Sequence, residues 1–170
     1  MTGDAVWYEA AQVVGITNAL NVAADTLGVL GAVEEAVAPV ETRALFADIR
    51  DFYQTDDVPM GFRFIAHDPG YAADVWAATK HAFTDHRLPR RFKEALAFAV
   101  SMTTHSALGT AWHLSQMRRF GVRARGVMEI VGVTQMFSSY TKIADTLQLE
   151  PDMGDIAPVD TTPAPGGPLP

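Results

Sequence analysis

The residues best suited to chemistry lie on two predicted helices in the middle of the chain. Glu94 and Ser101 are seven residues apart and share one face of the first helix. Ser106, Gly109 and His113 share a face of the second helix, at i, i+3 and i+7. If the two helices pack antiparallel across the short turn between them, Glu94 approaches His113. A carboxylate beside an imidazole fixes the tautomer of the ring, and we therefore predict that this pair transfers protons.

Three polar side chains around this pair are candidates for contacting a substrate: His105, Ser106 and Ser101. Simpler interpretations remain open. His105 could instead interact with the dipole at the C-terminal end of the first helix. Glu94 and His113 could form an ion pair that only satisfies polar groups inside a helical core. Ser106 lies near His113, but no nucleophile-elbow motif surrounds it, and we do not expect a serine nucleophile.

Basic residues precede Glu94 in the first turn of its predicted helix. They are Arg90, Arg91 and Lys93. Charged side chains in a first turn are mostly exposed, so we expect all three to be solvated. A basic group near the predicted pocket could also bind the carboxylate of an acidic substrate.

The pattern around these residues is helical. Apolar residues recur near a 3.6-residue period, and the sequence before residue 151 has neither alternating β-branched runs nor Asn-Gly or Asp-Gly hairpin turns. Asp68 and Pro69 are typical of a helix cap and the first helical position. We predict an all-α fold of six or seven helices with short connections. The predicted helices cover about residues 7–30, 41–54, 69–83, 89–104, 108–120 and 124–147, with a short apolar segment at 62–65.

The amino-acid composition of the chain excludes several classes of function. The chain has 170 residues, no cysteine and a net charge of −7. Disulfides, thiolate metal sites and thiol chemistry are therefore excluded, and the negative charge disfavours nucleic acid and anionic membranes as partners. The uncharged stretch Ala95–Met117 carries too many polar residues for a membrane span, and no basic leader opens the sequence. We expect a soluble, cytoplasmic protein.

The chain is expected to divide into three parts. Residues 1–40 form an N-terminal helical extension, residues 41–150 form the main domain, and residues 151–170 form a disordered tail that holds six of the ten prolines. A weak repeat with an offset of 120 residues relates the extension to the last long helix. Its matches are Glu9 with Glu129, Val13 with Val133, and the run ADTL at 24–27 with the same run at 144–147.

At the positions named above, the sequence resembles the AhpD-like superfamily, which includes the alkylhydroperoxidase AhpD and carboxymuconolactone decarboxylase. Its redox members carry Glu, eleven residues, Cys, two residues, Cys, three residues and His. Glu94, Ser106, Gly109 and His113 have this spacing without a gap. The resemblance covers about residues 46–150 and implies an AhpD-like helical bundle. Both cysteine positions are lost, so thiol peroxidase activity is not expected, because a hydroxyl is a far weaker acid than a thiol and has no reversible oxidation.

The decarboxylase branch of this superfamily works without the cysteine pair. The resemblance therefore favours a cofactor-independent lyase of the carboxymuconolactone decarboxylase type, without a metal, that acts on a small organic acid or lactone. In that interpretation Glu94 and His113 are the acid–base pair. The resemblance also implies a homo-oligomer, as AhpD-like proteins are commonly dimers, trimers or hexamers.

Two alternatives remain. Residues 17–28 resemble the terminal helix of an AhpD-like unit, and residues 44–78 resemble a segment of the group I 2-haloacid dehalogenases. In those enzymes two AhpD-like units are joined and an aspartate activates water between them. No aspartate of this sequence can be assigned that role. The other alternative is a non-catalytic binding or scaffold protein that kept the fold after losing its thiols.

Overall fold

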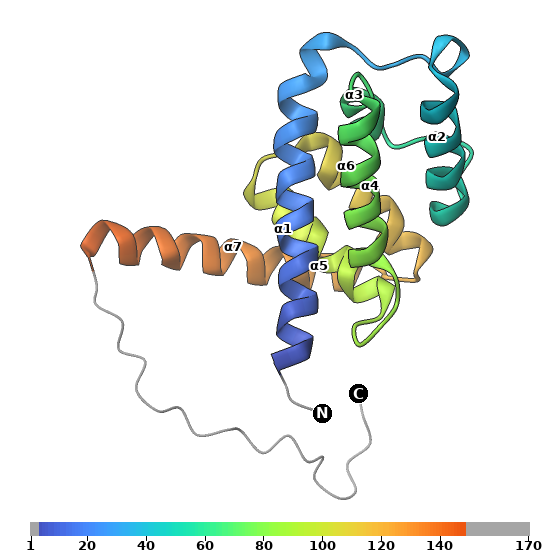
Figure 1. Cartoon of the computed structure of the whole chain (residues 1–170). Coiled ribbons are helices and arrows are strands. Elements are labelled where there is room, and N and C mark those ends of the chain that lie inside the picture. The colour runs from blue at the N-terminus through green and yellow to red at the C-terminus, as the bar shows by residue number, and fades with distance from the viewer. Residues whose placement is uncertain (1–3, 149–170) are drawn as a thin grey trace, which may run out of the picture.

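Seven α-helices and two short 3₁₀ helices make up the part of the chain that the structure describes. The computed structural model describes residues 4–148, and no strand occurs among them (Figure 1). The elements are α1 (Asp4–Leu27), η1 (Gly28–Leu30), η2 (Glu35–Val37), α2 (Val40–Tyr53), α3 (Met60–Ile65), α4 (Pro69–Phe83), α5 (Arg90–Thr103), α6 (Ala107–Arg119) and α7 (Ala124–Leu147). The predicted all-α fold with six or seven helices is confirmed. The predicted tail at 151–170 lies outside the described residues.

Local sequence signals set where the helices begin and end. The carboxylate of Asp68 caps α4 by accepting a hydrogen bond from a backbone N–H three residues on, and Pro69 occupies the first helical position. The hydroxyl of Ser106 caps α6 by accepting from the N–H of Gly109 at 3.2 Å. Gly121 follows the end of α6 with a φ of 80°, a conformation that favours glycine.

An aromatic core lies among α2, α3 and α4. Trp76 is its centre, with the rings of Phe52 and Phe62 packed edge-on at centroid distances of 5.3 and 5.4 Å. Edge-to-face pairs of this kind each add about 0.5–1.5 kcal/mol beyond the area they bury. A second cluster joins α1, α4 and α5 through Val13, Phe83 and their buried neighbours. Of the helices that carry the predicted site residues, α5 therefore packs into the second cluster and α6 packs against the first through Trp112.

Helix α1 belongs to the body of the protein. It contacts α3, α4, α5 and α6. Figure 1 shows this helix running along the other helices of the body. Its buried residues form one ridge, every third or fourth position: Glu9, Val13, Thr17, Asn21 and Ala24. Of the described residues, only the segment from Asp4 to Leu30 is long and apolar enough to cross a membrane. The buried polar side chains of this segment fit a helix that packs on the protein body better than a helix in lipid. The predicted domain boundary at residue 40 stays a prediction.

A buried ion pair fastens α1 to α5. The ammonium of Lys93, which is fully buried, lies 2.5 Å from Oε1 of Glu9. It also donates to the carbonyls of Ala82 and Thr84, at 2.8 and 2.6 Å. Burial alone raises the pKa of Glu9, but hydrogen bonds from Lys93 and from two backbone N–H groups of the α4–α5 loop outweigh burial and hold this pKa below its usual value. The expectation that Lys93 is solvated is therefore wrong, because three oxygen partners replace its water.

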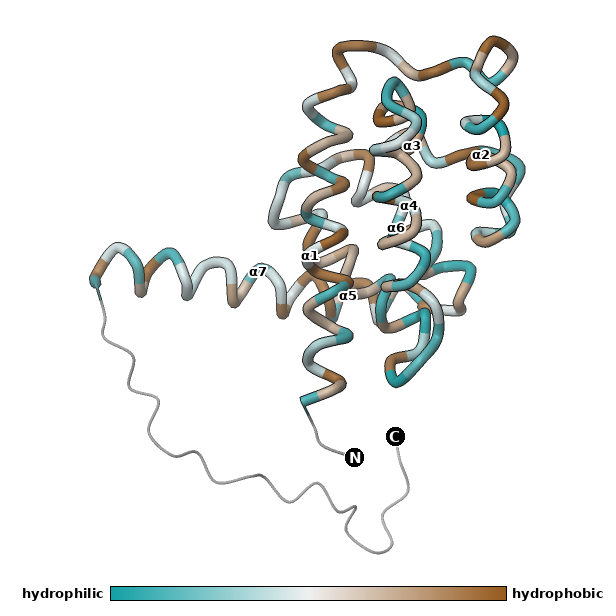
Figure 2. The backbone as a smooth tube through the Cα atoms, viewed as in Figure 1, coloured by the Kyte–Doolittle hydropathy of each residue, from teal (hydrophilic) through white to brown (hydrophobic). Residues whose placement is uncertain are grey.

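Helix α7 stands away from the body (Figure 1). It contacts α5, and none of its 24 residues is buried. Apolar positions nevertheless recur along it, as they do along the helices of the body (Figure 2). Its exposed large apolar residues are Met128, Val133, Met136, Phe137, Tyr140, Ile143 and Leu147. Within the described residues, nothing covers this face.

Candidate active site

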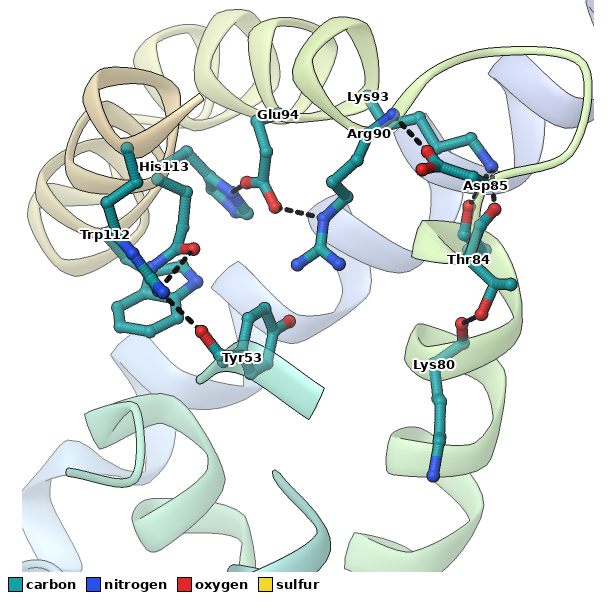
Figure 3. Close-up of polar contacts among 12 residues, drawn as sticks. Tyr53, Lys80, Thr84, Asp85, Arg90, Lys93, Glu94, Trp112 and His113 are labelled. Carbon is teal, nitrogen blue, oxygen red and sulfur yellow. Dashed lines mark hydrogen bonds and ion pairs between the residues drawn. The ribbon is translucent and has the colours of Figure 1, made fainter. Parts of the chain in front are cut away.

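Glu94 on α5 and His113 on α6 are in direct contact. Nδ1 of His113 lies 2.7 Å from Oε2 of Glu94, and the two side chains point toward one another across the interface of their helices (Figure 3). Glu94 is fully buried and His113 is 6% exposed. The antiparallel approach predicted from their spacing is therefore confirmed. Because a carboxylate only accepts hydrogen bonds, Nδ1 carries the hydrogen, and in the neutral ring Nε2 keeps the lone pair.

Arg90 holds the other oxygen of Glu94. Its Nε donates to Oε1 at 2.6 Å, one helical turn away on α5 (Figure 3). The guanidinium also lies 4.7–5.8 Å from the centres of four rings, which belong to Phe52, Tyr53, Phe83 and Phe120. Arg90 is 9% exposed, so the prediction that it is solvated is wrong. Stacking on aromatic faces replaces the water that the cation loses, and one guanidinium nitrogen, Nη2, is left without a hydrogen-bond partner.

These contacts fix the orientation of the imidazole. Glu94 holds Nδ1, and the ring of Phe83 stacks on the imidazole at 5.8 Å with an 8° angle between the planes. Among the described residues, none makes a hydrogen bond to Nε2, and His113 lines a cavity of about 330 Å³. The arrangement can therefore present one basic nitrogen to a bound molecule while the other is held by a carboxylate.

The cavity lies between α1 and α6, with α2, α3 and α4 contributing to its wall. Its apolar lining includes Leu20, Met60, Phe62 and Trp112. No lysine, arginine, aspartate or glutamate of the described residues lines it. The site is thus a largely apolar chamber with a few polar groups, which is typical of small-molecule sites.

Side chains of α1 contact Ser106 and Gly109, the two positions where the resembled motif has cysteine in its redox members. At Gly109, a Cβ would lie 2.6 Å from Oγ of Ser101 and closer still to Oδ1 of Asn21. The amide nitrogen of Asn21 donates to Ser101 Oγ at 3.0 Å and to Thr104 Oγ1 at 3.1 Å. Asn21 therefore occupies the space that a larger residue at 109 would need.

Ser106 has a comparable contact. Its hydroxyl donates to Oδ1 of Asp25 at 3.2 Å while it accepts from the N–H of Gly109. It lines the cavity, as predicted for a substrate contact, but no imidazole is bonded to it. These contacts give Ser106 a structural part as the cap of α6, and no base is placed to activate it as a nucleophile.

The other two predicted substrate contacts lie elsewhere. Ser101 is buried and bonded to Asn21, and it does not line the cavity. His105 is exposed and also lies outside the lining. The physical reason is its position in the turn between α5 and α6, where it adopts a left-handed φ of 58°.

Several cavity residues escaped the sequence analysis. Thr17 and Asn21 line the cavity from α1, and Tyr53 lines it from the end of α2, where burial raises its pKa. The one available signal was the spacing of Glu9, Thr17 and Asn21, which places polar residues along the buried ridge of a helix that is otherwise apolar. In residues 4–148, no group of three or more His, Asp or Glu side chains that could hold a metal ion is found.

Comparison with known proteins shows the fold. No protein-family model matches this chain, and no curated protein sequence matches it either. Its structure is similar to the crystal structure of the alkylhydroperoxidase AhpD core from Rhodospirillum rubrum ATCC 11170, with a TM-score of 0.63 and 22% sequence identity. The match covers 66% of this chain and 83% of that chain. The chain therefore has the AhpD-like fold that its motif spacing implied.

Proposed function

We propose that this chain is a cofactor-independent enzyme of the carboxymuconolactone decarboxylase type, in which Glu94 and His113 form the acid–base pair. One observation carries the proposal: a fully buried carboxylate orients an imidazole that lines an apolar cavity and whose Nε2 has no hydrogen-bond partner among the described residues. Burying the charge of Glu94 costs free energy, and proton transfer to or from a bound substrate would explain why the protein keeps that charge. Arg90 is a positioning residue in this account, since it holds Glu94 and does not line the cavity.

The reaction would proceed by proton transfer. In a decarboxylation next to a conjugated lactone, the bond to the carboxylate carbon breaks, CO₂ leaves, and the electron pair moves into the carbonyl to give an enolate. Protonated His113 then delivers a proton from Nε2 to carbon, and water returns a proton to the ring. Glu94 stabilises the imidazolium while it is charged. General acid–base catalysis of this kind contributes about 10²–10⁴ in rate.

The lining of the cavity favours a lactone that carries a single carboxylate over a polycarboxylic acid. The sequence left open that an arginine receives a substrate carboxylate, but no arginine of the described residues lines the cavity. The guanidinium of Arg90 is directed to Glu94 and to aromatic rings. The carboxylate that leaves as CO₂ would have protonated His113 as its one charged partner among the described residues, and the uncharged lactone ring fits the apolar wall.

The dehalogenase alternative receives no support from the cavity. An aspartate that activates water would need to face it, and no aspartate or glutamate in residues 4–148 lines it. Thiol peroxidase chemistry is closed to a chain without cysteine. The non-catalytic alternative predicts that Glu94 and His113 matter for stability alone.

The test is turnover of a panel of five- and six-membered lactones that carry a carboxyl substituent, followed by chromatography and by CO₂ release. The same lactones without the carboxyl group cannot release CO₂ and serve as blanks. Glu94→Gln and His113→Ala should each lower the rate at least about 100-fold, with helical content unchanged by circular dichroism. His81→Ala, at an exposed histidine outside the cavity, is the matched control and should keep the rate. Equal turnover in wild type and in both site variants would contradict the roles of Glu94 and His113, whereas no turnover of any lactone by the wild type would support the non-catalytic alternative.

We also propose that α7 packs against a second copy of this chain. The offset of 120 residues aligns α7 with α1, and three of the matched positions, Glu9, Val13 and Ala24, belong to the buried ridge of α1. Helix α7 therefore carries part of the pattern of a helix that packs on an AhpD-like body. In its own chain α1 already packs there, so the surface that α7 fits is on another copy.

A further inference from the structure

Tyr53 is a buried phenol at the wall of the cavity. It lies at the end of α2, is 4% exposed and lines the same cavity as His113. The guanidinium of Arg90 lies 5.0 Å from the centre of its ring. Three aromatic side chains also hold the ring, with centroids 5.0–5.8 Å away: Phe52, Trp76 and Trp112. These contacts fix the ring and, with it, the position of the phenol oxygen.

The other hydroxyl groups of the described lining are not available to a ligand. The hydroxyl of Thr17 has no partner, but solvent does not reach it. Three others donate their hydrogen to an oxygen of the protein, at 2.7 or 3.2 Å: Thr79, Ser106 and Ser115. Tyr53 therefore carries the one hydroxyl in this part of the chain that can still donate into the cavity.

The hydroxyl of Tyr53 is in contact with accessible space. Within residues 4–148, three buried side-chain atoms have neither a hydrogen-bond partner nor contact with solvent: Oγ1 of Thr17, Oγ1 of Thr42 and Nη2 of Arg90. The oxygen of Tyr53 is not among them, and no described residue accepts its hydrogen. This oxygen therefore reaches open space, which beside this residue is the cavity. The O–H group can donate to a bound molecule.

The phenol of Tyr53 keeps its proton at neutral pH. Burial raises its pKa, and the negative charge of Glu94 adds to this effect. Arg90 and Trp112 lower the same pKa without cancelling the rise. A neutral phenol of this kind donates a hydrogen bond to an oxygen that becomes negative, and it does not lose its own proton in doing so.

Tyr53 and His113 lie close to the same group of side chains. The guanidinium of Arg90 lies 5.0 and 5.1 Å from the ring centres of Tyr53 and Phe83, and Phe83 stacks on the imidazole of His113. Figure 3 shows Tyr53 on α2 opposite Glu94 and His113, which come from α5 and α6. A small ring bound in the cavity can therefore meet the imidazole with one atom and the phenol with another.

We propose that Tyr53 is a further catalytic residue, whose hydroxyl donates to the carbonyl oxygen of the lactone. This inference rests on the proposed function, because it gives a partner to the oxygen that becomes negative in that reaction. When the bond to the carboxylate carbon breaks, CO₂ leaves, and the electron pair moves to the carbonyl oxygen that Tyr53 holds. His113 then delivers its proton from Nε2 to carbon and the carbonyl forms again.

The experiment compares the wild type with Tyr53→Phe, which removes the hydroxyl and keeps the ring. With the carboxyl-bearing lactones, kcat should fall about 10²–10³-fold. KM should stay within about threefold, because this hydrogen bond strengthens only as charge develops on the oxygen. Tyr53→Phe should also melt no lower than the wild type, since its hydroxyl has no acceptor in the folded protein. A hydroxyl with a structural role would lower the melting temperature when removed.

A binding measurement separates this inference from the proposed function. Ionised 4-nitrophenol carries a negative oxygen, and 4-nitrotoluene has a methyl group in its place. Tyr53→Phe should weaken the binding of 4-nitrophenolate about tenfold and leave that of 4-nitrotoluene unchanged, because the variant loses one hydrogen bond to a charged oxygen. If the wild type turns over no lactone but this difference persists, the proposed function fails and Tyr53 remains a donor to a negative oxygen.

Tyr71→Phe is the matched control. Tyr71 is 45% exposed and lies outside the cavity lining, so the same change there should leave kcat and both affinities unaltered. The inference is overturned if Tyr53→Phe keeps kcat within about twofold of the wild type while His113→Ala does not. It is also overturned if Tyr53→Phe lowers the melting temperature, if it weakens both ligands equally, or if the wild type does not bind 4-nitrophenolate.

Discussion

The carboxamide of Asn21 and the bare α-carbon of Gly109 are packed against each other, with no room for a side chain at position 109. This contact joins α1 to α6 at position 109, where the motif that the sequence resembles has a cysteine in its redox members. A thiol at 109 and the carboxamide at 21 exclude each other in this backbone arrangement.

Gly109→Ala should destabilise the protein by about 1–3 kcal/mol, because the added methyl overlaps Asn21 and the hydroxyl of Ser101. Chemical denaturation of the single variants and of the double variant with Asn21→Ala measures the coupling. In the Asn21→Ala background the cost of Gly109→Ala should fall by about 1 kcal/mol or more. Additive effects of the two substitutions would show that the carboxamide does not restrict position 109.

Glu9→Gln should cost about 3–5 kcal/mol of unfolding free energy, because it leaves the buried ammonium of Lys93 without its counter-charge. The matched control is Glu34→Gln. Glu34 pairs with Arg63 at 3.0 Å, but its side chain is 73% exposed, so this change should stay within about 0.5 kcal/mol. Similar losses in both variants would mean that the buried pair does not fasten α1.

Stability should fall in acid as carboxylates with lowered pKa become protonated. A hydrogen bond from Arg50 lowers the pKa of Glu35 below 4.5, and one from Lys80 lowers that of Asp48 below 3.8. Glu9 behaves likewise, despite the opposing effect of burial. Since each folded pKa lies below the unfolded value, the unfolded state binds protons first as pH falls. The stabilisation by these three carboxylates is complete above pH 4.5 and is lost as the pH falls below it. Thermal unfolding between pH 6 and pH 3 should show this loss as a falling melting temperature. A melting temperature that is constant over this range would contradict the assignment.

Phe137→Glu should convert the protein to monomers, because it places a charge in the middle of the exposed apolar face of α7, where Phe137 is 67% exposed. Light scattering coupled to size-exclusion chromatography gives the mass directly. Val37→Glu changes an even more exposed apolar residue, 83% exposed on η2, and should leave the mass of the assembly unaltered. If the wild-type protein is a monomer, the proposed contact between α7 and a second copy is wrong.

The sequence predicted local structure well because local signals determine it. Asp68 with Pro69 specified the start of α4, and the spacing of Glu94 and His113 specified their contact. The exposure that the sequence predicted for Arg90 and Lys93 is wrong, because their burial depends on partners that lie far away in the sequence. Lys93 finds Glu9 across 84 positions of sequence, and Arg90 finds rings from three other segments. The position of a residue in the first turn of a helix does not reveal such partners.

The same reason explains why Thr17 was missed. A threonine within an apolar helix usually bonds to the carbonyl four residues before it, as Thr79 does. Only the folded arrangement reveals that the hydroxyl of Thr17 has no such partner and that this residue lines the cavity. Likewise, the exposure of His105 follows from the left-handed turn between α5 and α6, which the helix periodicity does not encode.

The most direct test of the central claim is the lactone turnover rate of His113→Ala with and without added imidazole. If His113 carries the proton, the variant should be at least about 100-fold slower than wild type, and free imidazole that enters the vacated part of the cavity should raise its rate with increasing concentration. A variant that turns over the same lactone within twofold of the wild-type rate, with no response to imidazole, would contradict the assignment of Glu94 and His113 as the acid–base pair.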